Sequence, residues 1–203
     1  MPLPKDVYAN CDVLDSIPKP NAENWLKEIE LLAAELPRNA SVLQVGSGNG
    51  ARALRLLEAR PDLKLTGLEI DADLVDVAEQ KVKEKNVGIN FVQGNIVSPP
   101  SLSHFDYVIC LNNTLGYIPK QRKAVENMKK LGNIVIISVY GEKFDDDLAR
   151  KYFRSINLEI DHMEGNQFIM KNFSSVKRYS KGEIASWGGK VTETPIGYFC
   201  VLG

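Results

Sequence analysis

Hydrophobic and polar positions follow two different periods along this chain, and the two periods alternate. Short apolar runs bounded by Gly, Pro, Asn or Asp are typical of strands, whereas apolar residues at i, i+3 and i+4 are typical of amphipathic helices. The short runs predict strands at residues 41–45, 63–70, 89–93, 105–111 and 133–140. The helical spacing predicts helices at residues 21–36, 50–60, 72–87 and 119–131, with Asn21 capping the first and Gly88 ending the third.

Strands that alternate with helices indicate a parallel sheet that is covered by helices on both faces. Right-handed crossovers bring the carboxyl ends of parallel strands to one edge, and ligands of such sheets bind at that edge. The segments that follow the predicted strands should therefore carry the functional residues: 46–50, 69–71, 94–96, 111–117 and 139–141.

The alternation of predicted strands and helices ends after residue 141. We expect a helix at 145–155, an antiparallel hairpin that turns at residues 164–166, a short helix at 179–187 and two final strands within 190–203. No linker is long enough to mark a second domain, so residues 1–203 are predicted to form one domain. Residues 1–37 would be an N-terminal segment and helix, and residues 142–178 a small insertion.

The composition and charge argue against several classes of function. Hydrophobic residues make up 44% of the 203 residues and charged residues 25%, which is ordinary for a soluble globular protein. The net charge of −1 provides no basic field and argues against a nucleic-acid partner, and no apolar run is long enough to cross a membrane. Cys11, Cys110 and Cys200 lie far apart and lack metal-binding spacing, so we expect no metal site, no disulfide framework and a cytoplasmic setting.

Three glycines, Gly46, Gly48 and Gly50, separate the first strand from the next helix in SVLQVGSGNGARAL. Glycine is costly inside regular elements, so the cluster predicts a turn that approaches a ligand too closely for a Cβ atom. Two ligands fit, namely the pyrophosphate of NAD or FAD and the amino-acid tail of S-adenosylmethionine. Ala51 completes a G-x-G-x-x-A dinucleotide pattern. Glu69 suits either cofactor, because both offer ribose hydroxyls to a carboxylate, and a tight turn without a ligand is the remaining alternative.

Four segments in register distinguish between these ligands: GSGNG, GLEIDADLVDVAEQ, FVQGNI and FDYVICLNNTLGYI. With them, residues 40–140 resemble the class I S-adenosylmethionine-dependent methyltransferases. The resemblance implies a doubly wound α/β fold with a seven-stranded, mostly parallel sheet, an antiparallel last strand in GYFCVLG, helices on both faces and a small hairpin insertion after the fifth strand. It also implies S-adenosylmethionine as the methyl donor and S-adenosylhomocysteine as the product.

The resemblance assigns cofactor roles to individual residues. The glycine turn would lie against the methionine portion, Glu69 would accept both ribose hydroxyls, Ile70 and Ile96 would flank the adenine, and Asn95 would meet its amino group. The full set of implied cofactor-binding residues is Gly46, Ser47, Gly48, Gly50, Glu69, Ile70, Asn95, Ile96, Leu111 and Asn112. Two positions depart from the family pattern, because Gln44 and Asn95 stand where the family usually has acidic residues.

The acceptor would be oriented by residues that follow the fourth strand. Asn112, Asn113 and Tyr117 are the candidates, although they would equally well shape a loop and the start of a helix. We hypothesise that residues 142–178 form a lid over the acceptor, and that Tyr8 reaches over the cofactor. The cations near the end of the insertion, Lys171, Lys177 and Arg178, are interpreted as a solvated charged face and not as an anion site.

The sequence predicts an enzyme that methylates a small molecule, with three alternatives. The acceptor would instead be RNA or protein, or the chain would bind the cofactor without catalysis, or it would be a nucleotide-linked oxidoreductase. Methyl transfer from a sulfonium needs a general base only when the acceptor must first lose a proton, so the lack of an evident catalytic dyad is compatible with an enzyme.

Overall fold

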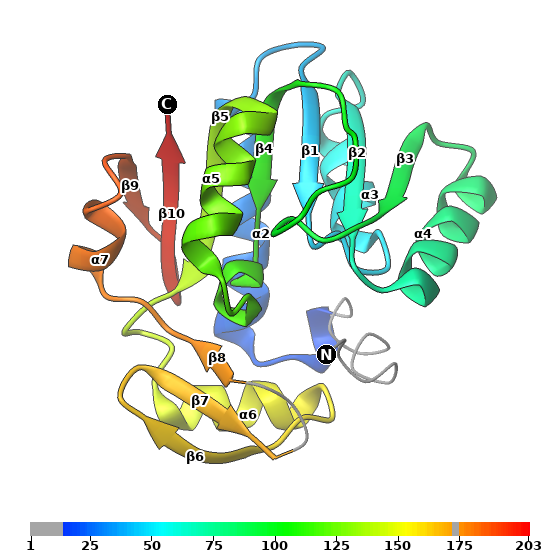
Figure 1. The fold of residues 1–203 in the computed structure, drawn as a ribbon. Helices are drawn as coiled ribbons and strands as arrows, with labels where there is room; N and C mark the ends of the chain where they lie inside the picture. The colour runs from blue at the N-terminus through cyan, green and yellow to red at the C-terminus, as the bar shows by residue number, and fades with distance from the viewer. Residues whose placement is uncertain (1–13, 172–174) are drawn as a thin grey trace.

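The computed structural model describes residues 14–171 and 175–203. Its centre is a seven-stranded sheet with the strand order β3-β2-β1-β4-β5-β10-β9 (Figure 1). The first five strands pair in parallel: β1 (Ser41–Val45), β2 (Lys64–Glu69), β3 (Ile89–Gln93), β4 (Phe105–Cys110) and β5 (Gly132–Tyr140). β10 (Gly197–Leu202) runs antiparallel to β5 and to β9 (Lys190–Glu193). The predicted sheet, with its antiparallel last strand, is therefore confirmed.

Helices cover both faces of this sheet. One face packs against α2 (Lys19–Glu35), α3 (Ala51–Ala59) and α4 (Ala72–Lys85), and the other packs against α5 (Gln121–Leu131) and α7 (Lys181–Ala185). Successive strand residues point to opposite faces, so Val42 packs with α2 while Leu43 and Val45 pack with α5. Within the described ranges, no helix is both long enough and apolar enough to cross a membrane.

Two predicted helix ends are wrong. α2 begins at Lys19 after the N-cap Pro18, so Asn21 lies inside the helix and does not cap it. Pro20 is compatible with this first turn, because the first amide groups of a helix have no intrahelical acceptor. α4 ends earlier than Gly88, because Asn86 adopts the left-handed conformation and closes the helix.

The insertion after β5 contains α6 (Asp146–Ser155) and a second sheet with the order β6-β7-β8. β6 (Ile160–Glu164) and β7 (Gln167–Met170) form the predicted antiparallel hairpin, and β8 (Ser175–Lys177) is a third strand that we did not predict. Phe144, Phe153 and Phe168 pack with ring centroids 5.7 to 6.0 Å apart and hold α6 against this sheet. Figure 1 shows the insertion beyond the carboxyl ends of the parallel strands.

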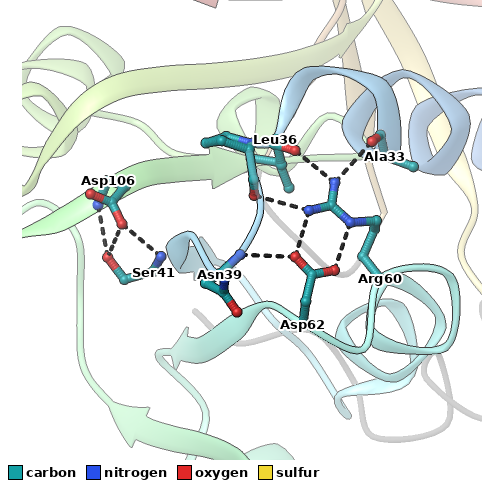
Figure 2. A network of polar contacts seen from close by, with 8 residues as sticks. Ala33, Leu36, Asn39, Ser41, Arg60, Asp62 and Asp106 are labelled. Atoms are coloured by element: carbon teal, nitrogen blue, oxygen red, sulfur yellow. Dashed lines mark hydrogen bonds and ion pairs between the residues drawn. The ribbon is translucent and has the colours of Figure 1, made fainter.

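Polar contacts at the opposite edge, where the parallel strands begin, tie α2 to the sheet (Figure 2). The Arg60 guanidinium donates to the carbonyl oxygens of Ala33, Leu36 and Pro37 at the end of α2. It also pairs with both carboxylate oxygens of Asp62, at 2.8 and 2.7 Å. The last carbonyl groups of a helix have no intrahelical donor, so Arg60 satisfies groups that would otherwise need water.

A serine links a carboxylate to a backbone amide at the same edge. The hydroxyl of Ser41 donates to Oδ2 of Asp106 at 2.7 Å and accepts from the amide of Asp106 at 3.0 Å (Figure 2). This contact joins the start of β1 to the start of β4. A similar serine contact occurs at the carboxyl edge, as described below.

Candidate functional site

The glycine turn between β1 and α3 is the first component of the site. Gly46, Gly48 and Gly50 have φ angles of +68°, +55° and +79°. A Cβ atom on Gly46 would lie 2.3 Å from Cγ2 of Thr114, and one on Gly50 would lie 2.9 Å from Cζ of Phe91. The positive φ angle and the close neighbours therefore both favour glycine at positions 46 and 50. Because Thr114 begins η2 (Thr114–Tyr117), the segment after β4 packs directly on the glycine turn.

Hydrogen bonds fix this turn to the end of β2. The amides of Gly46 and Ser47 donate to the carbonyl oxygen of Leu68 at 2.8 and 3.3 Å, and the amide of Gly48 donates to Oε2 of Glu69 at 2.8 Å. The Ser47 hydroxyl is buried and has no hydrogen-bond partner within the described part of the chain. The two segments that we predicted to hold the cofactor, the turn and the end of β2, are therefore in contact.

Glu69 is a buried carboxylate at the end of β2. Its side chain accepts backbone N–H groups from Gly48, from Ile70 at 2.9 Å and from Asp71 at 3.2 Å, and the residue is 5% exposed. Burial raises the pKa of the Glu69 carboxyl, and the backbone donors oppose that shift. An ionised carboxylate offers about four lone-pair sites, and the backbone uses three of them, so one site is free for a ribose hydroxyl and a second hydroxyl would share an oxygen with a backbone N–H group.

The predicted adenine-binding residues differ in exposure. Ile70 follows Glu69 directly and is 56% exposed. Asn95 is also exposed, but its Oδ1 accepts the amide of Val97 at 2.9 Å, so it closes a turn, as asparagine often does. Ile96 is 4% exposed and packs in the core with Leu43. Ile70 therefore presents the apolar surface that an adenine ring can cover.

The segment after β4 has a tightly bent backbone. Leu111 is buried, and Asn112 and Asn113 have φ angles of +49° and +59°, a region in which asparagine is enriched among non-glycine residues. The Asn112 amide donates to Oγ of Ser138 at 2.8 Å, and Oδ1 of Asn112 accepts the Tyr140 hydroxyl at 3.3 Å. Asn112 is half-buried at the carboxyl end of β4, beside the glycine turn.

Asn113 has a different environment from Asn112. It is fully buried, its Nδ2 donates to the carbonyl oxygen of Lys177 at 3.0 Å, and its Oδ1 accepts the Tyr140 amide at 3.1 Å. Asn113 therefore connects the segment after β4 to β5 and β8, and both the nitrogen and the oxygen of its side-chain amide take part in these contacts. Tyr117 is half-buried and packs against the aromatic cluster that includes Phe144.

The cations of the insertion are paired with carboxylates. Lys171 pairs with Glu159, Lys177 with Glu183, and Arg178 with Asp146. Lys171 is exposed, as a solvated charged face requires, but Lys177 and Arg178 are half-buried and lie over the rings of Tyr179 and Phe168, so that interpretation is wrong for these two cations. Tyr8, the less favoured candidate for a residue that reaches over the cofactor, lies outside the described residues.

Sequence reasoning missed a buried polar group on α2. The Glu28 side chain is 1% exposed and accepts hydrogen bonds from Arg52 at 3.0 Å and from Ser138 at 2.6 Å. We used only the apolar residues of this helix to find its buried face. Glu28 lies three positions after Trp25, which is helical spacing, so the signal was present in the sequence.

The residues at this edge fit an adenosyl group. Glu69 supplies an acceptor for hydroxyl groups, the glycine turn supplies backbone that can be approached closely, and Ile70 supplies exposed apolar surface next to both. Gln44 is 3% exposed and neutral, so it does not supply the acidic group that the family usually has at this position.

Comparisons with known proteins agree with this geometry. Residues 42–132 match the family model described as methyltransferase domain. A carboxy-S-adenosyl-L-methionine synthase of Campylobacter jejuni subsp. doylei is 29% identical over 164 residues, which are 77% of this chain and 62% of that protein. The release factor glutamine methyltransferase of Streptococcus pneumoniae is 38% identical over 73 residues, 36% of this chain and 25% of that protein. The chain thus spans less than two thirds of the length of these relatives.

The fold also has counterparts among solved structures. An S-adenosylmethionine-dependent methyltransferase from Clostridium acetobutylicum superposes with a TM-score of 0.61 at 12% identity, covering 88% of this chain and 89% of that one. The strand order and the antiparallel β10 agree with that fold, and residues 42–132 lie within it. Residues 42–132 thus match a methyltransferase domain, and the whole chain has a fold similar to that of S-adenosylmethionine-dependent methyltransferases.

Proposed function

We propose that this chain transfers a methyl group from S-adenosylmethionine to a small-molecule acceptor. The observation that carries the proposal is the position of Glu69, whose buried carboxylate joins the end of β2 to the glycine turn. A carboxylate in this position accepts two ribose hydroxyl groups while the turn supports the rest of the cofactor. The exposed side chain of Ile70 lies next to it, where adenine would bind.

The chain's own residues hold and orient the reactants. S-adenosylmethionine, when bound, supplies a methyl group that its sulfonium charge already activates. Gly46, Ser47 and Gly48 would support the methionine portion, and Asn112 at the end of β4 would face the methyl-donor side. Holding the acceptor about 3 Å from the methyl carbon and in line with sulfur supplies roughly 7–11 kcal/mol of barrier lowering.

The insertion supports an acceptor of small size. We propose that residues 142–178 act as a lid within one methyltransferase domain, because Asn113 fastens β8 to the loop after β4. A second fastening joins the amide of Tyr179 to the carbonyl oxygen of Tyr140 at 2.8 Å. A lid held at the carboxyl ends of the strands excludes water from the transfer step and limits the size of the acceptor.

Asn112 and Tyr117 are the polar groups proposed to orient the acceptor, and the buried Tyr140 supports Asn112. The hydroxyl of Tyr140 donates to Asn112, and burial raises the pKa of Tyr140 well above its ordinary value, so this phenol stays protonated. Tyr140 therefore acts as a donor that fixes the Asn112 amide group. A general base is unnecessary for acceptors that react without losing a proton first.

Two specific relatives favour other chemistry. One is named a carboxy-S-adenosyl-L-methionine synthase, so a second candidate function is modification of S-adenosylmethionine itself. The other is named a release factor glutamine methyltransferase, which favours a protein acceptor, but its match spans only 25% of that protein. A cofactor-binding module without catalysis is the fourth candidate, and the neutral Gln44 supports it, because it stands where the family usually has an acidic residue.

One incubation distinguishes these candidates. The purified chain receives S-adenosylmethionine with a labelled methyl group, together with either a pool of small metabolites or a pool of proteins. The proposal predicts label in a small metabolite and S-adenosylhomocysteine as the nucleoside product. Label in protein supports the protein acceptor, a carboxylated nucleoside detected by mass spectrometry supports the synthase chemistry, and tight binding without any product supports the silent module.

A further inference from the structure

Glu28 is a buried carboxylate that the proposed methyl transfer does not use. It lies on the sheet-facing side of α2 among Asn21, Asn24 and Trp25, and its side chain is 1% exposed. Burying a carboxylate is costly unless charge and hydrogen bonds compensate it. The hydrogen bonds and charges around Glu28 therefore decide whether its burial is tolerated.

The contacts of Glu28 compensate both of its oxygen atoms. Oε2 accepts Nη1 of Arg52 at 3.0 Å. Oε1 accepts the Ser138 hydroxyl at 2.6 Å and Nδ2 of Asn24 at 2.9 Å. Burial raises the pKa of the Glu28 carboxyl, and Arg52, Ser138 and Asn24 act in the opposite direction. Arg52 is itself only 12% exposed and lies over the Trp25 ring at 5.0 Å, so both members of this ion pair are held in place.

The contacts of Glu28 reach two parts of the site, namely the helix that follows the glycine turn and the loop that follows β4. Arg52 lies in the first turn of α3, two residues after Gly50. At the other end, the Ser138 hydroxyl accepts the amide of Asn112 at 2.8 Å. Asn112 is in the left-handed conformation, which is disfavoured for a residue with a side chain, so a bond to its amide helps to hold it there.

The network also places a carboxylate near Gln44, the position in β1 at which the family usually has an acidic residue and this chain does not. Val42 and Ile136 pack with α2, so Gln44 and Ser138, two positions further along β1 and β5, face the same helix. Gln44 is neutral, whereas Glu28 brings a carboxylate to this face from α2. The negative charge thus comes from a helix and not from the end of β1.

We propose that Glu28 is a positioning residue for methyl transfer, which holds Asn112 through Ser138 and the first turn of α3 through Arg52. This inference rests on the proposed function, because it assumes that Asn112 and the glycine turn flank the methyl donor. The network Arg52–Glu28–Ser138–Asn112 then positions the Asn112 loop and the first turn of α3 relative to each other. Loss of any link would leave both parts folded, with the Asn112 loop held less firmly relative to the glycine turn.

Glu28→Gln and Ser138→Ala test this network, and Ser41→Ala is the matched control. Glu28→Gln keeps the size of the side chain and removes the charge that Arg52 faces. Ser138→Ala leaves the Glu28–Arg52 ion pair and removes the hydroxyl that donates to Glu28 and accepts the Asn112 amide, so that only the direct interaction between the Asn112 backbone and Glu28 remains. Ser41 also joins a carboxylate to a backbone amide, but at the solvent-exposed amino edge of the sheet, so its loss removes contacts of the same kind away from the site (Figure 2).

Two measurements are made on each full-length variant. Hydrogen–deuterium exchange of the segment 111–118 reports how firmly the Asn112 loop is held, and calorimetry with S-adenosylhomocysteine reports cofactor affinity. Both network variants should show about tenfold faster exchange at residues 112 and 113 and about tenfold weaker binding, since one lost hydrogen bond of this kind corresponds to about one power of ten. Ser41→Ala should leave both values at those of the wild type.

The exchange measurement needs no ligand, so it tests the network separately from the proposed function. Absence of S-adenosylhomocysteine binding by the wild type contradicts the proposed function. The inference is overturned if residue 112 of Ser138→Ala exchanges at the wild-type rate, or if this variant binds S-adenosylhomocysteine with the wild-type affinity. A merely structural role lowers the melting temperature of Ser138→Ala and Ser41→Ala alike and leaves affinity unchanged, which also overturns it. If Glu28→Gln fails to fold, Ser138→Ala alone decides between these results.

Discussion

Replacing Glu69 by alanine tests how the cofactor's ribose is held. The variant removes a carboxylate that accepts three backbone N–H groups, from Gly48, Ile70 and Asp71. It also relieves the cost of burying that carboxylate, which is the cause of its raised pKa. The two effects on the free energy of unfolding oppose each other, so we expect a net loss of only about 1 kcal/mol. The variant should therefore fold and can be assayed.

The expected loss of affinity is much larger than the loss of stability. A hydrogen bond to a charged group contributes about 1.5–3 kcal/mol, and Glu69 is proposed to accept two ribose hydroxyls. Loss of both bonds costs about 3 kcal/mol at the lower limit. At about 1.4 kcal/mol for each power of ten, the dissociation constant for S-adenosylhomocysteine should rise at least about 100-fold.

Calorimetry with S-adenosylhomocysteine measures this change, and thermal unfolding measures stability in parallel. Glu84→Ala is the control, since Glu84 is an exposed acid on α4 with one hydrogen bond to Gln80. The control should bind as the wild type does. If Glu69→Ala binds within threefold of the wild type, the carboxylate does not hold the ribose and the reasoning is refuted.

Three further substitutions test separate parts of the account. Gly46→Ala places a Cβ atom 2.3 Å from Thr114 at a positive φ, so thermal unfolding should show a loss of about 1–3 kcal/mol, and wild-type stability contradicts the crowding. Asn113→Ala leaves two buried backbone groups unpaired, so it should destabilise by about 1–3 kcal/mol and speed hydrogen exchange at residues 175–177; unchanged exchange there means that Asn113 does not fasten β8. Hydrogen bonds from Lys181 and a second lysine lower the pKa of Glu193 to about 2, so this carboxylate stabilises the fold above its ordinary pKa of 4.5 and loses that contribution as pH falls toward 2. Denaturant titrations at pH 6 and pH 3 should therefore show the stability gap between wild type and Glu193→Gln shrinking with acid and with salt; a gap that is constant with pH contradicts the ion pairs.

Most of the fold could be predicted from the sequence because its strands are strongly apolar and its turns carry clear signals. The run that forms β4 and the glycines after β1 are examples, and the order of elements follows from them. β8 could not be predicted, because Ser175–Lys177 is a three-residue strand without a distinctive pattern. Its pairing with β7 depends on the hairpin before it.

The site could be predicted in part. Glu69 and Ile70 occupy the end of β2, which strand order alone places at the binding edge. The environment of Asn113 could not be predicted, since its partners lie in β5 and in the unpredicted β8. The role of Asn95 remained open between ligand and turn, and its contact with Val97 depends on local geometry that the sequence does not specify.

Glu28 illustrates a different limit. Its spacing from Trp25 placed it on the buried face of α2, but a charged residue on a helix is usually solvated. Only the positions of Arg52 and Ser138, 24 and 110 residues further along the chain, reveal why a carboxylate is buried there. Long-range polar contacts of this kind leave no periodic signal in a single sequence.

The central claim is that the edge formed by the glycine turn and Glu69 binds an adenosyl group that carries a methionine tail. The most direct measurement is calorimetric titration of the wild-type chain with S-adenosylmethionine, S-adenosylhomocysteine and NAD in turn. The account predicts saturable one-site binding of the first two and no heat of binding with NAD. Binding of NAD, or the absence of binding by both S-adenosyl compounds, would contradict it.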